Sequence, residues 1–465
     1  MNLGCRTRLE STFLNDMLFA ISTIATCVTL GLLLFWPGIG VQVALMCKPI
    51  IDAGVWYRLI GGFRIPEVVG VVVPMLLLFH LFITQRGRPE KMHLVWVWLP
   101  YLLANFLAFA IAISHGRLEW AVKVFFLLMN GFVWFYALQT YVNDRKSFQR
   151  LLICLLIGGL FPMMMGLYQA TTGAIWQMRI GTAGLVRNVG VYHNSTNYRY
   201  FAYMTLTVIL LYWSYFSSRT FIQRMLFLAY GAVCGIVLFK VYSKAAILTM
   251  GLWVIIWAVM RRNFLILITL PLAVVVTDIV LGGEIFAKLK LVFLKETLAL
   301  EGQINSDLLL TGRVGMVKEK ITEFNELDVF NQMFGVGRGY GGGHNDYLRC
   351  LITSGVFGLL SYLVLLGTVG FLLTRNMVYA NSPLNVMGFM VYIAYMVDTM
   401  GLAPGLYTSF QWYAWGFIGL AIHGVPGLEE DLPDDVGDAF FFDGKDVSSL
   451  WDTPNGYGSR TDSSF

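Results

Sequence analysis

Residues 341–363 read GGGHNDYLRCLITSGVFGLLSYL, three glycines and a histidine followed by a long apolar run. From Gly355 onward the run has the uncharged composition of a helix that crosses a bilayer. His344 precedes apolar residues at 347, 348 and 351, the spacing of one helical face. The stretch therefore predicts a membrane helix with a polar, glycine-rich mouth.

The whole chain has the composition of a membrane protein. Of its 465 residues, 57% are hydrophobic and 13% are charged, about half the charge of an average soluble domain. Backbone groups in lipid must be paired within their own segment, so the recurring apolar stretches predict α-helices. The net charge of +5 is small for this length and gives no reason to expect nucleic acid as a partner. We expect an all-α polytopic membrane protein.

The apolar stretches predict about twelve membrane helices. They are expected near residues 17–36, 66–85, 93–114, 120–139, 149–170, 199–216, 221–239, 243–260, 263–282, 355–374, 384–403 and 408–424. Segment 38–60 is apolar but contains Lys48, Pro49 and Asp52, so it is either a re-entrant or interfacial element or a thirteenth span. The first helix lacks a small-residue cleavage site, which favours a retained helix over a signal peptide.

Charges between the helices orient the bundle. If the N-terminus is cytoplasmic, the loops predicted inside each carry Lys or Arg; they are 85–91, 142–150, 217–224, 260–263 and 374–383. The opposite, periplasmic face then holds a short loop at 171–198 and a large one at 283–354. Both carry cations as well, which a long exported loop tolerates.

This orientation divides the chain into four parts. Residues 1–282 hold the first nine helices, 283–354 the large periplasmic loop, 355–424 the last three helices, and 425–465 an acidic tail. The tail composition is typical of a disordered cytoplasmic segment. Within the large loop, RVGMVKEKITEFNEL at 313–327 is amphipathic, which predicts a helix lying along the membrane surface.

Cations from separate segments are predicted at the same outer face. Arg187 precedes the helix at 199–216, Lys244 begins the helix at 243–260, and Arg313 opens the amphipathic helix as TGR. Each cation alone is most simply a snorkelling anchor. Together they favour an anion site, and guanidinium groups suit the oxygens of a pyrophosphate.

His344 is the best-placed candidate for a catalytic base. It precedes a helix whose free amides Asn345 or Asp346 can cap, and a helix N-terminus disfavours the protonated imidazole. The alternative is a histidine hydrogen-bonded at an interface. No HExxH, paired His/Cys or DxD pattern suggests a metal, so we expect neither a metal nor another cofactor. The six cysteines show no CxxC spacing and are expected to be small buried residues.

The segment around His344 resembles the hallmark loop of the O-antigen ligase and polymerase superfamily, integral membrane glycosyltransferases of bacterial surface polysaccharide assembly. The matching residues are TGR at 311–313, His344–Asn345, Tyr347–Leu348, Leu351, Gly355, Gly358–Leu359, and Arg187 in RNVGVYHN. The family's Ser–Arg pair is Ser243–Lys244 here, which keeps the charge and loses the bidentate fork. The resemblance covers roughly residues 180–375.

The resemblance implies a GT-C-like fold and metal-independent, inverting transfer of a glycan from undecaprenyl pyrophosphate to an acceptor hydroxyl. The reaction would occur at the periplasmic face of the bacterial inner membrane. His344 would be the base; Arg187, Arg313, Lys244 and Arg338 would bind the pyrophosphate; Gly343, Asn345 and Tyr347 would support the site.

Three functions stay open at this stage. The first is an O-antigen or exopolysaccharide polymerase, in which another glycan is the acceptor. The second is a ligase, in which lipid A core or protein is the acceptor. The third, from a different class, is a polysaccharide transporter or flippase. Partners would include the bilayer and other polysaccharide assembly proteins.

Overall fold

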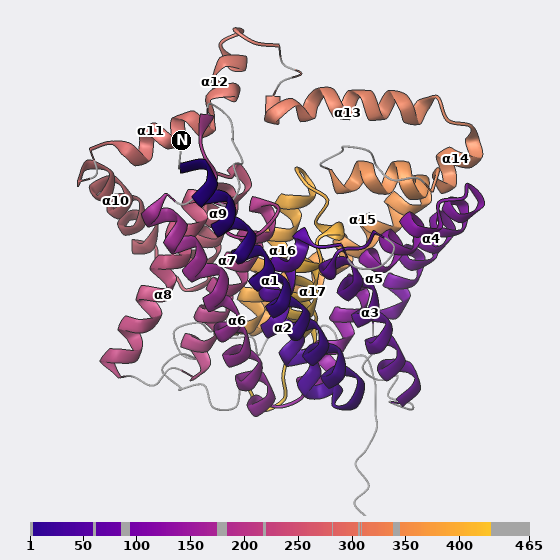
Figure 1. Cartoon of the computed structure of the whole chain (residues 1–465), viewed down its shortest axis with the longest axis horizontal. Coiled ribbons are helices and arrows are strands. Elements are labelled where there is room, and N and C mark those ends of the chain that lie inside the picture. Colours follow the sequence, from indigo (N-terminus) through magenta and orange to yellow (C-terminus); the bar gives the residue numbers. More distant parts are fainter. Residues whose placement is uncertain are drawn as a thin grey trace, which may run out of the picture.

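The described part of the chain is an α-helical bundle (Figure 1). A computed structural model describes residues 3–58, 62–84, 94–173, 184–216, 220–280, 282–305, 307, 309–337 and 345–428, with side chains described outside 3–15 and 309–311. Within these ranges no β-strand occurs, and one isolated bridge joins Arg58 and Arg64. The predicted all-α membrane class is confirmed, because apolar helices of spanning length recur along the chain.

The helical elements have the following order along the chain. The first half comprises α1 (Leu3–Phe35), α2 (Pro37–Ala53), η1 (Gly54–Trp56), α3 (Ile65–Phe79), η2 (His80–Thr84), α4 (Val95–Ser114), α5 (Leu118–Tyr141), α6 (Arg145–Thr172) and α7 (Ser195–Phe216). The second half comprises α8 (Phe221–Lys240), α9 (Lys244–Met260), α10 (Leu265–Val280), α11 (Glu284–Val292), α12 (Leu294–Leu300), α13 (Leu309–Asn325), α14 (Val329–Phe334), α15 (Asp346–Ala380), α16 (Pro383–Thr399), η6 (Pro404–Leu406) and α17 (Thr408–His423).

Every predicted membrane segment coincides with a helix. Within the described ranges, eight helices are long and apolar enough to cross a bilayer, or nine if the bent pair α10 and α11 is one span. Seven of the eight were predicted; the eighth is Pro37–Trp56, the segment whose nature the sequence left open. The number of twelve spans and the periplasmic placement of the large loop stay predictions.

Helices α1 and α2 form a tight antiparallel hairpin, which changes where the N-terminus lies. A Cβ on Gly40 would stand 2.6 Å from the Leu33 nitrogen, so only glycine fits this contact. Tyr57, just after η1, donates to Asp16 Oδ1 of α1 at 3.0 Å. The N-terminal end of α1 therefore lies at the same end of the bundle as α11–α13 (Figure 1). The sequence predicted the N-terminus on the cytoplasmic face and the large loop on the periplasmic face. Because both lie at the same end of the bundle, these two predictions cannot hold together.

The helices at the centre of the bundle are buried among the others. Fourteen of the sixteen residues of α17 are buried, and α7 and α16 are buried along most of their length. Tyr200 of α7 stacks on Phe410 of α17, with ring centroids 4.1 Å apart. None of these three is among the spanning helices: α16 and α17 have 17 and 16 residues, which is shorter than the others, and α7, with 22 residues, is not apolar enough. A helix surrounded by protein needs no lipid-facing apolar stripe.

The amphipathic helix of the large loop is confirmed as α13, which extends across one end of the bundle in Figure 1. It begins four residues before Arg313, at Leu309, and Gly312 adopts φ +84° within it. That left-handed conformation is one glycine adopts without cost.

Helix α15 is broken at Gly355, where the sequence predicted the membrane segment to begin. Gly355 has φ +69° and ψ −170°. The interrupted ladder leaves the carbonyls of Ile352 and Thr353 to accept from Val336 N at 3.1 Å and Gly337 N at 3.2 Å. A Cβ on Gly355 would stand 2.3 Å from the Met333 carbonyl oxygen, so glycine permits both the bend and the contact.

Candidate functional site

The C-terminal turn of α16, residues 398–401, is the point on which the candidate site converges. Asp398 is 1% exposed and accepts two hydrogen bonds of 2.6 Å from Nη2 of Arg199, which is 2% exposed. Nη1 of Arg199 donates to Ser243 Oγ at 2.7 Å. The ion pair therefore joins α7, α9 and α16, and it neutralises a charge that would be costly to bury alone.

Arg313 lies against the same turn. A Cβ on Gly401 would stand 2.6 Å from Nη1 of Arg313, so the guanidinium group occupies the space that a side chain would fill. Burial, followed by repulsion from Arg199, lowers the pKa of Arg313. Loss of charge from arginine is not expected in a protein, so the shift reports that the group is desolvated among like charges.

Arg187 comes to this region from the loop between α6 and α7. The loop is fixed by Asn188 N, which donates to the Lys240 carbonyl at 3.1 Å, and by Gly190 N, which donates to Gln169 Oε1 at 2.9 Å. Arg187 is partly buried, and its Nε has no hydrogen-bond partner among the described residues. Burial, and then the charge of Arg199, lower the pKa of Arg187.

Lys244 reaches the site as well, but it is paired. Its Nζ forms an ion pair with Glu296 Oε1 of α12 and lies 5.8 Å from the ring centroid of Phe293. The second carboxylate oxygen of Glu296 is buried and accepts no hydrogen bond from the described residues. Glu296 also attracts Arg313 electrostatically.

These contacts leave the site with a surplus of positive charge. Arg187, Arg199, Arg313 and Lys244 face two carboxylates, of which Asp398 pairs with Arg199 and Glu296 with Lys244. Arg187 and Arg313 have no carboxylate within ion-pair distance among the described residues. Two partly buried, uncompensated guanidinium groups form an arrangement suited to an anion with several oxygens, such as a diphosphate.

The first turn of α15 is attached to the same turn of α16. Asn345 is the N-cap: its Oδ1 accepts from Leu348 N at 3.0 Å, and its Nδ2 donates to the Met400 carbonyl at 3.2 Å. Tyr347 accepts a hydrogen bond from Thr399 Oγ1 at 3.0 Å. Of the two caps that the sequence allowed, the structure selects Asn345, and it places Tyr347 and Asn345 beside the residues that hold Arg199 and Arg313.

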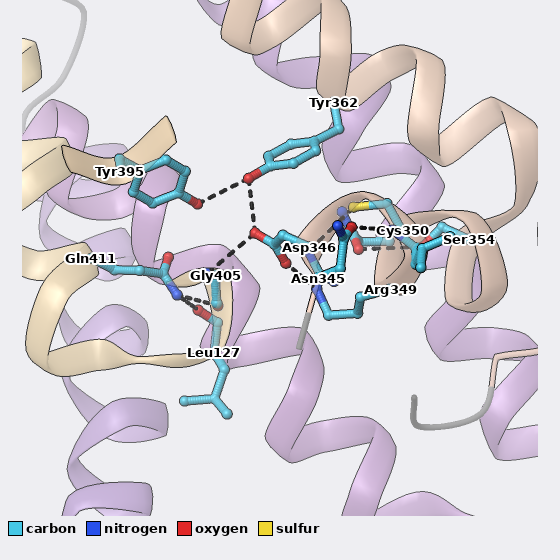
Figure 2. A network of polar contacts seen from close by, with 12 residues as sticks. Leu127, Asn345, Asp346, Arg349, Cys350, Ser354, Tyr362, Tyr395, Gly405 and Gln411 are labelled. Atoms are coloured by element: carbon cyan, nitrogen blue, oxygen red, sulfur yellow. Dashed lines mark hydrogen bonds and ion pairs between the residues drawn. The ribbon is translucent and has the colours of Figure 1, made fainter. Parts of the chain in front are cut away.

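Asp346 serves a different purpose, because it is fully buried beneath this turn (Figure 2). Its Oδ1 accepts from Arg349 Nε at 2.5 Å. Its Oδ2 accepts from Tyr362 at 2.8 Å and from Gly405 N at 3.4 Å. The hydroxyl of Tyr362 also lies 3.2 Å from that of Tyr395 of α16, and because its own proton goes to Asp346 it accepts this second hydrogen bond. The network fastens the start of α15 to α16 and to η6.

The predicted residues fall into two groups. Arg313, Asn345 and Tyr347 contact residues 399–401. Arg187 lies near enough to Arg199 to feel its charge, and Lys244 follows Ser243, the hydrogen-bond partner of Arg199. His344, Gly343 and Arg338 lie outside the described residues, so their roles stay predictions. Most of the acidic tail, from residue 429 on, also lies outside them.

Sequence reasoning missed three charged residues of the site. They are Arg199, Asp398 and Glu296, none of which the sequence analysis singled out. A usable signal existed for two of them, because Arg199 and Asp398 are ionisable residues within predicted membrane segments, where charges normally occur in pairs. Among the described residues no group of three or more His, Cys, Asp or Glu side chains is arranged to hold a metal ion.

Comparison with known proteins adds no relative: no protein-family model and no curated protein matches this sequence.

Proposed function

We propose that this protein is a membrane glycosyltransferase that extends a surface polysaccharide, taking the glycan from undecaprenyl pyrophosphate and passing it to a sugar hydroxyl. The observation that carries the proposal is the pair of partly buried guanidinium groups, Arg187 and Arg313, without a carboxylate partner among the described residues. A lipid diphosphate is an anion that naturally lies at the edge of a bilayer, where we place these two groups.

The charges suit the step in which the glycosidic bond breaks. The acceptor oxygen attacks the anomeric carbon as the bond from that carbon to the phosphate oxygen breaks, and the diphosphate departs with the bonding electrons. Negative charge on the diphosphate grows during this step, so fixed cations stabilise the transition state more than the bound substrate. Arg187 and Arg313 would supply this stabilisation, with Lys244 and Arg338 as further contacts.

The proton of the acceptor hydroxyl needs a base. We assign this role to His344, which directly precedes Asn345, the residue anchored to Met400. Gly343 would allow close approach of a ligand to the backbone, and Asn345 and Tyr347 would position the segment. Inversion at the anomeric carbon follows from a single displacement.

We place the site on the periplasmic side of the bacterial inner membrane. Helix α6 runs from Arg145 to the loop that carries Arg187, and α9 runs from Lys244 to Met260. The ends of these helices away from the site therefore carry Arg145, Lys146, Arg150, Arg261 and Arg262. An excess of Lys and Arg in short loops marks the cytoplasmic face, which favours an outer location for the site.

The test is a reconstituted reaction. Full-length protein in nanodiscs is incubated with an undecaprenyl-pyrophosphate oligosaccharide, and products are sized with and without a chelator. Lengthened lipid-linked chains, formed equally with the chelator, support the proposal. Transfer only to an added lipid A core acceptor would replace the polymerase by a ligase. No transfer to either acceptor, or a strict need for a divalent metal, would overturn the proposal.

A further inference from the structure

Glu296 is one of the two carboxylates in a site that contains four cations. It pairs with Lys244 through Oε1, while Oε2 is buried and accepts no hydrogen bond from any described residue. A buried acceptor without a donor is costly, so a purely structural ion pair would be expected to satisfy both oxygens. The carboxylate stands where an anion bound by Lys244 would stand.

The segment that carries Glu296 is attached weakly. Helix α12 has seven residues and none of them is buried; Leu300 is 87% exposed. Its ion pair reaches across to α9, a helix of the bundle. Because little packing would be lost, α12 can withdraw from Lys244 at a small cost once another anion offers more favourable contacts.

Glu296 also reduces the field of the cations that stay unpaired. It attracts Arg313, whose other charged neighbours are Arg199, Asp398 and Arg187. In contrast, Asp398 is fixed by two hydrogen bonds to Arg199 and is almost fully buried. Of the two carboxylates, only Glu296 belongs to a helix without a fully buried residue, and only Glu296 has an oxygen that accepts no hydrogen bond from the described residues.

We infer that Glu296 is an internal competitor for the diphosphate: it occupies Lys244 in the empty site and is displaced when the ligand binds. The inference rests on the proposed function and deepens it, because it states that Lys244 binds the diphosphate once Glu296 has been displaced. It explains why a cation predicted to bind pyrophosphate is found with a carboxylate partner. Glu296 thereby sets the affinity of the site without taking part in the chemical step.

Substitution of Glu296 distinguishes this role from a catalytic or structural one. Removing a competing charge a few ångströms from the ligand should tighten binding, so Glu296→Gln should lower the Kd for diphosphate by about tenfold. Glu296→Asp keeps the charge on a shorter side chain, so its Kd for diphosphate should lie between those of the wild type and of Glu296→Gln. In the transfer reaction Glu296→Gln should lower KM and leave kcat unchanged, whereas loss of a base would lower kcat.

The experiment measures binding of inorganic pyrophosphate and of a prenyl diphosphate to the full-length protein in nanodiscs by calorimetry. Glu284→Gln is the matched control, because Glu284 of α11 forms a similar ion pair with Lys288 but has a side chain 64% exposed. The control should bind like the wild type. Tighter binding of the prenyl form than of pyrophosphate identifies the lipid-linked diphosphate as the ligand; equal binding identifies free pyrophosphate.

Two results would overturn the inference, and they differ from a failure of the proposed function. The first is unchanged or weaker binding in Glu296→Gln while the wild type binds. The second is a fall in kcat in that variant with its melting temperature preserved. Should Glu296→Gln fail to fold, Glu296→Asp decides in the same direction. If the wild type binds neither diphosphate, the proposed anion site itself is wrong.

Discussion

Substituting Gly401 by alanine should displace Arg313 while leaving the fold intact. The new Cβ would stand 2.6 Å from Arg313 Nη1, and ordinary contact begins near 3.4 Å, so the guanidinium group must retreat by about 0.8 Å. Gly401 does not have a positive φ, so alanine introduces no backbone strain there. The displaced group is the far end of a flexible side chain, so the stability should change by less than about 1 kcal/mol.

Function should respond far more than stability. A displacement approaching 1 Å in a group that stabilises the transition state lowers the rate by roughly tenfold to a hundredfold. The assay is transfer from a lipid-pyrophosphate oligosaccharide in nanodiscs, with the melting temperature measured on the same samples. Gly251→Ala is the control, because no atom lies within 4 Å of its added Cβ and Gly251 is in α9, the helix of Lys244. Transfer by Gly401→Ala at the rate of this control would refute the placement of Arg313 in the site.

Three further substitutions test the fold and the chemistry separately. Asp398→Asn should destabilise the protein by about 3–5 kcal/mol, because it leaves Arg199 buried and charged without a counter-ion. The control is Glu284→Gln, which removes the carboxylate of an exposed ion pair. Equal melting temperatures for the two variants would contradict the prediction. Gly355→Ala should lower the free energy of unfolding by at least about 2 kcal/mol, because alanine is strained at this positive φ and its Cβ would stand 2.3 Å from the Met333 carbonyl oxygen. The control is Gly367→Ala, whose Cβ meets nothing within 4 Å, and it should melt at the wild-type temperature. His344→Ala should lower the rate of glycan transfer by about a hundredfold or more while the protein stays in the membrane. Transfer at the wild-type rate would show that His344 is not the base.

The helical class and most helix positions followed from hydropathy alone, because a segment facing lipid must be apolar over its whole length. The same reasoning left α2 undecided, because its Lys48 and Asp52 suggested an interrupted span. In the structure the two residues pair with each other, and Lys48 also donates to Thr408 at 2.9 Å. A charge pair inside the bundle does not face lipid, so a hydropathy scan cannot tell it from a break in a span.

The candidate site divides in a similar way. The sequence by itself determined that Arg187, Arg313 and Lys244 lie near one face and that a membrane segment begins at Gly355, because both depend on local pattern. That Gly355 instead breaks a longer helix was decided by the structure. Only the tertiary structure decided that Arg199 pairs with Asp398, 199 residues away, and that Glu296 neutralises Lys244. Which cations keep their charge available to a ligand depends on which carboxylates pack against them. That is set by the crossing of α7, α9, α12 and α16, and no local pattern in the sequence contains it.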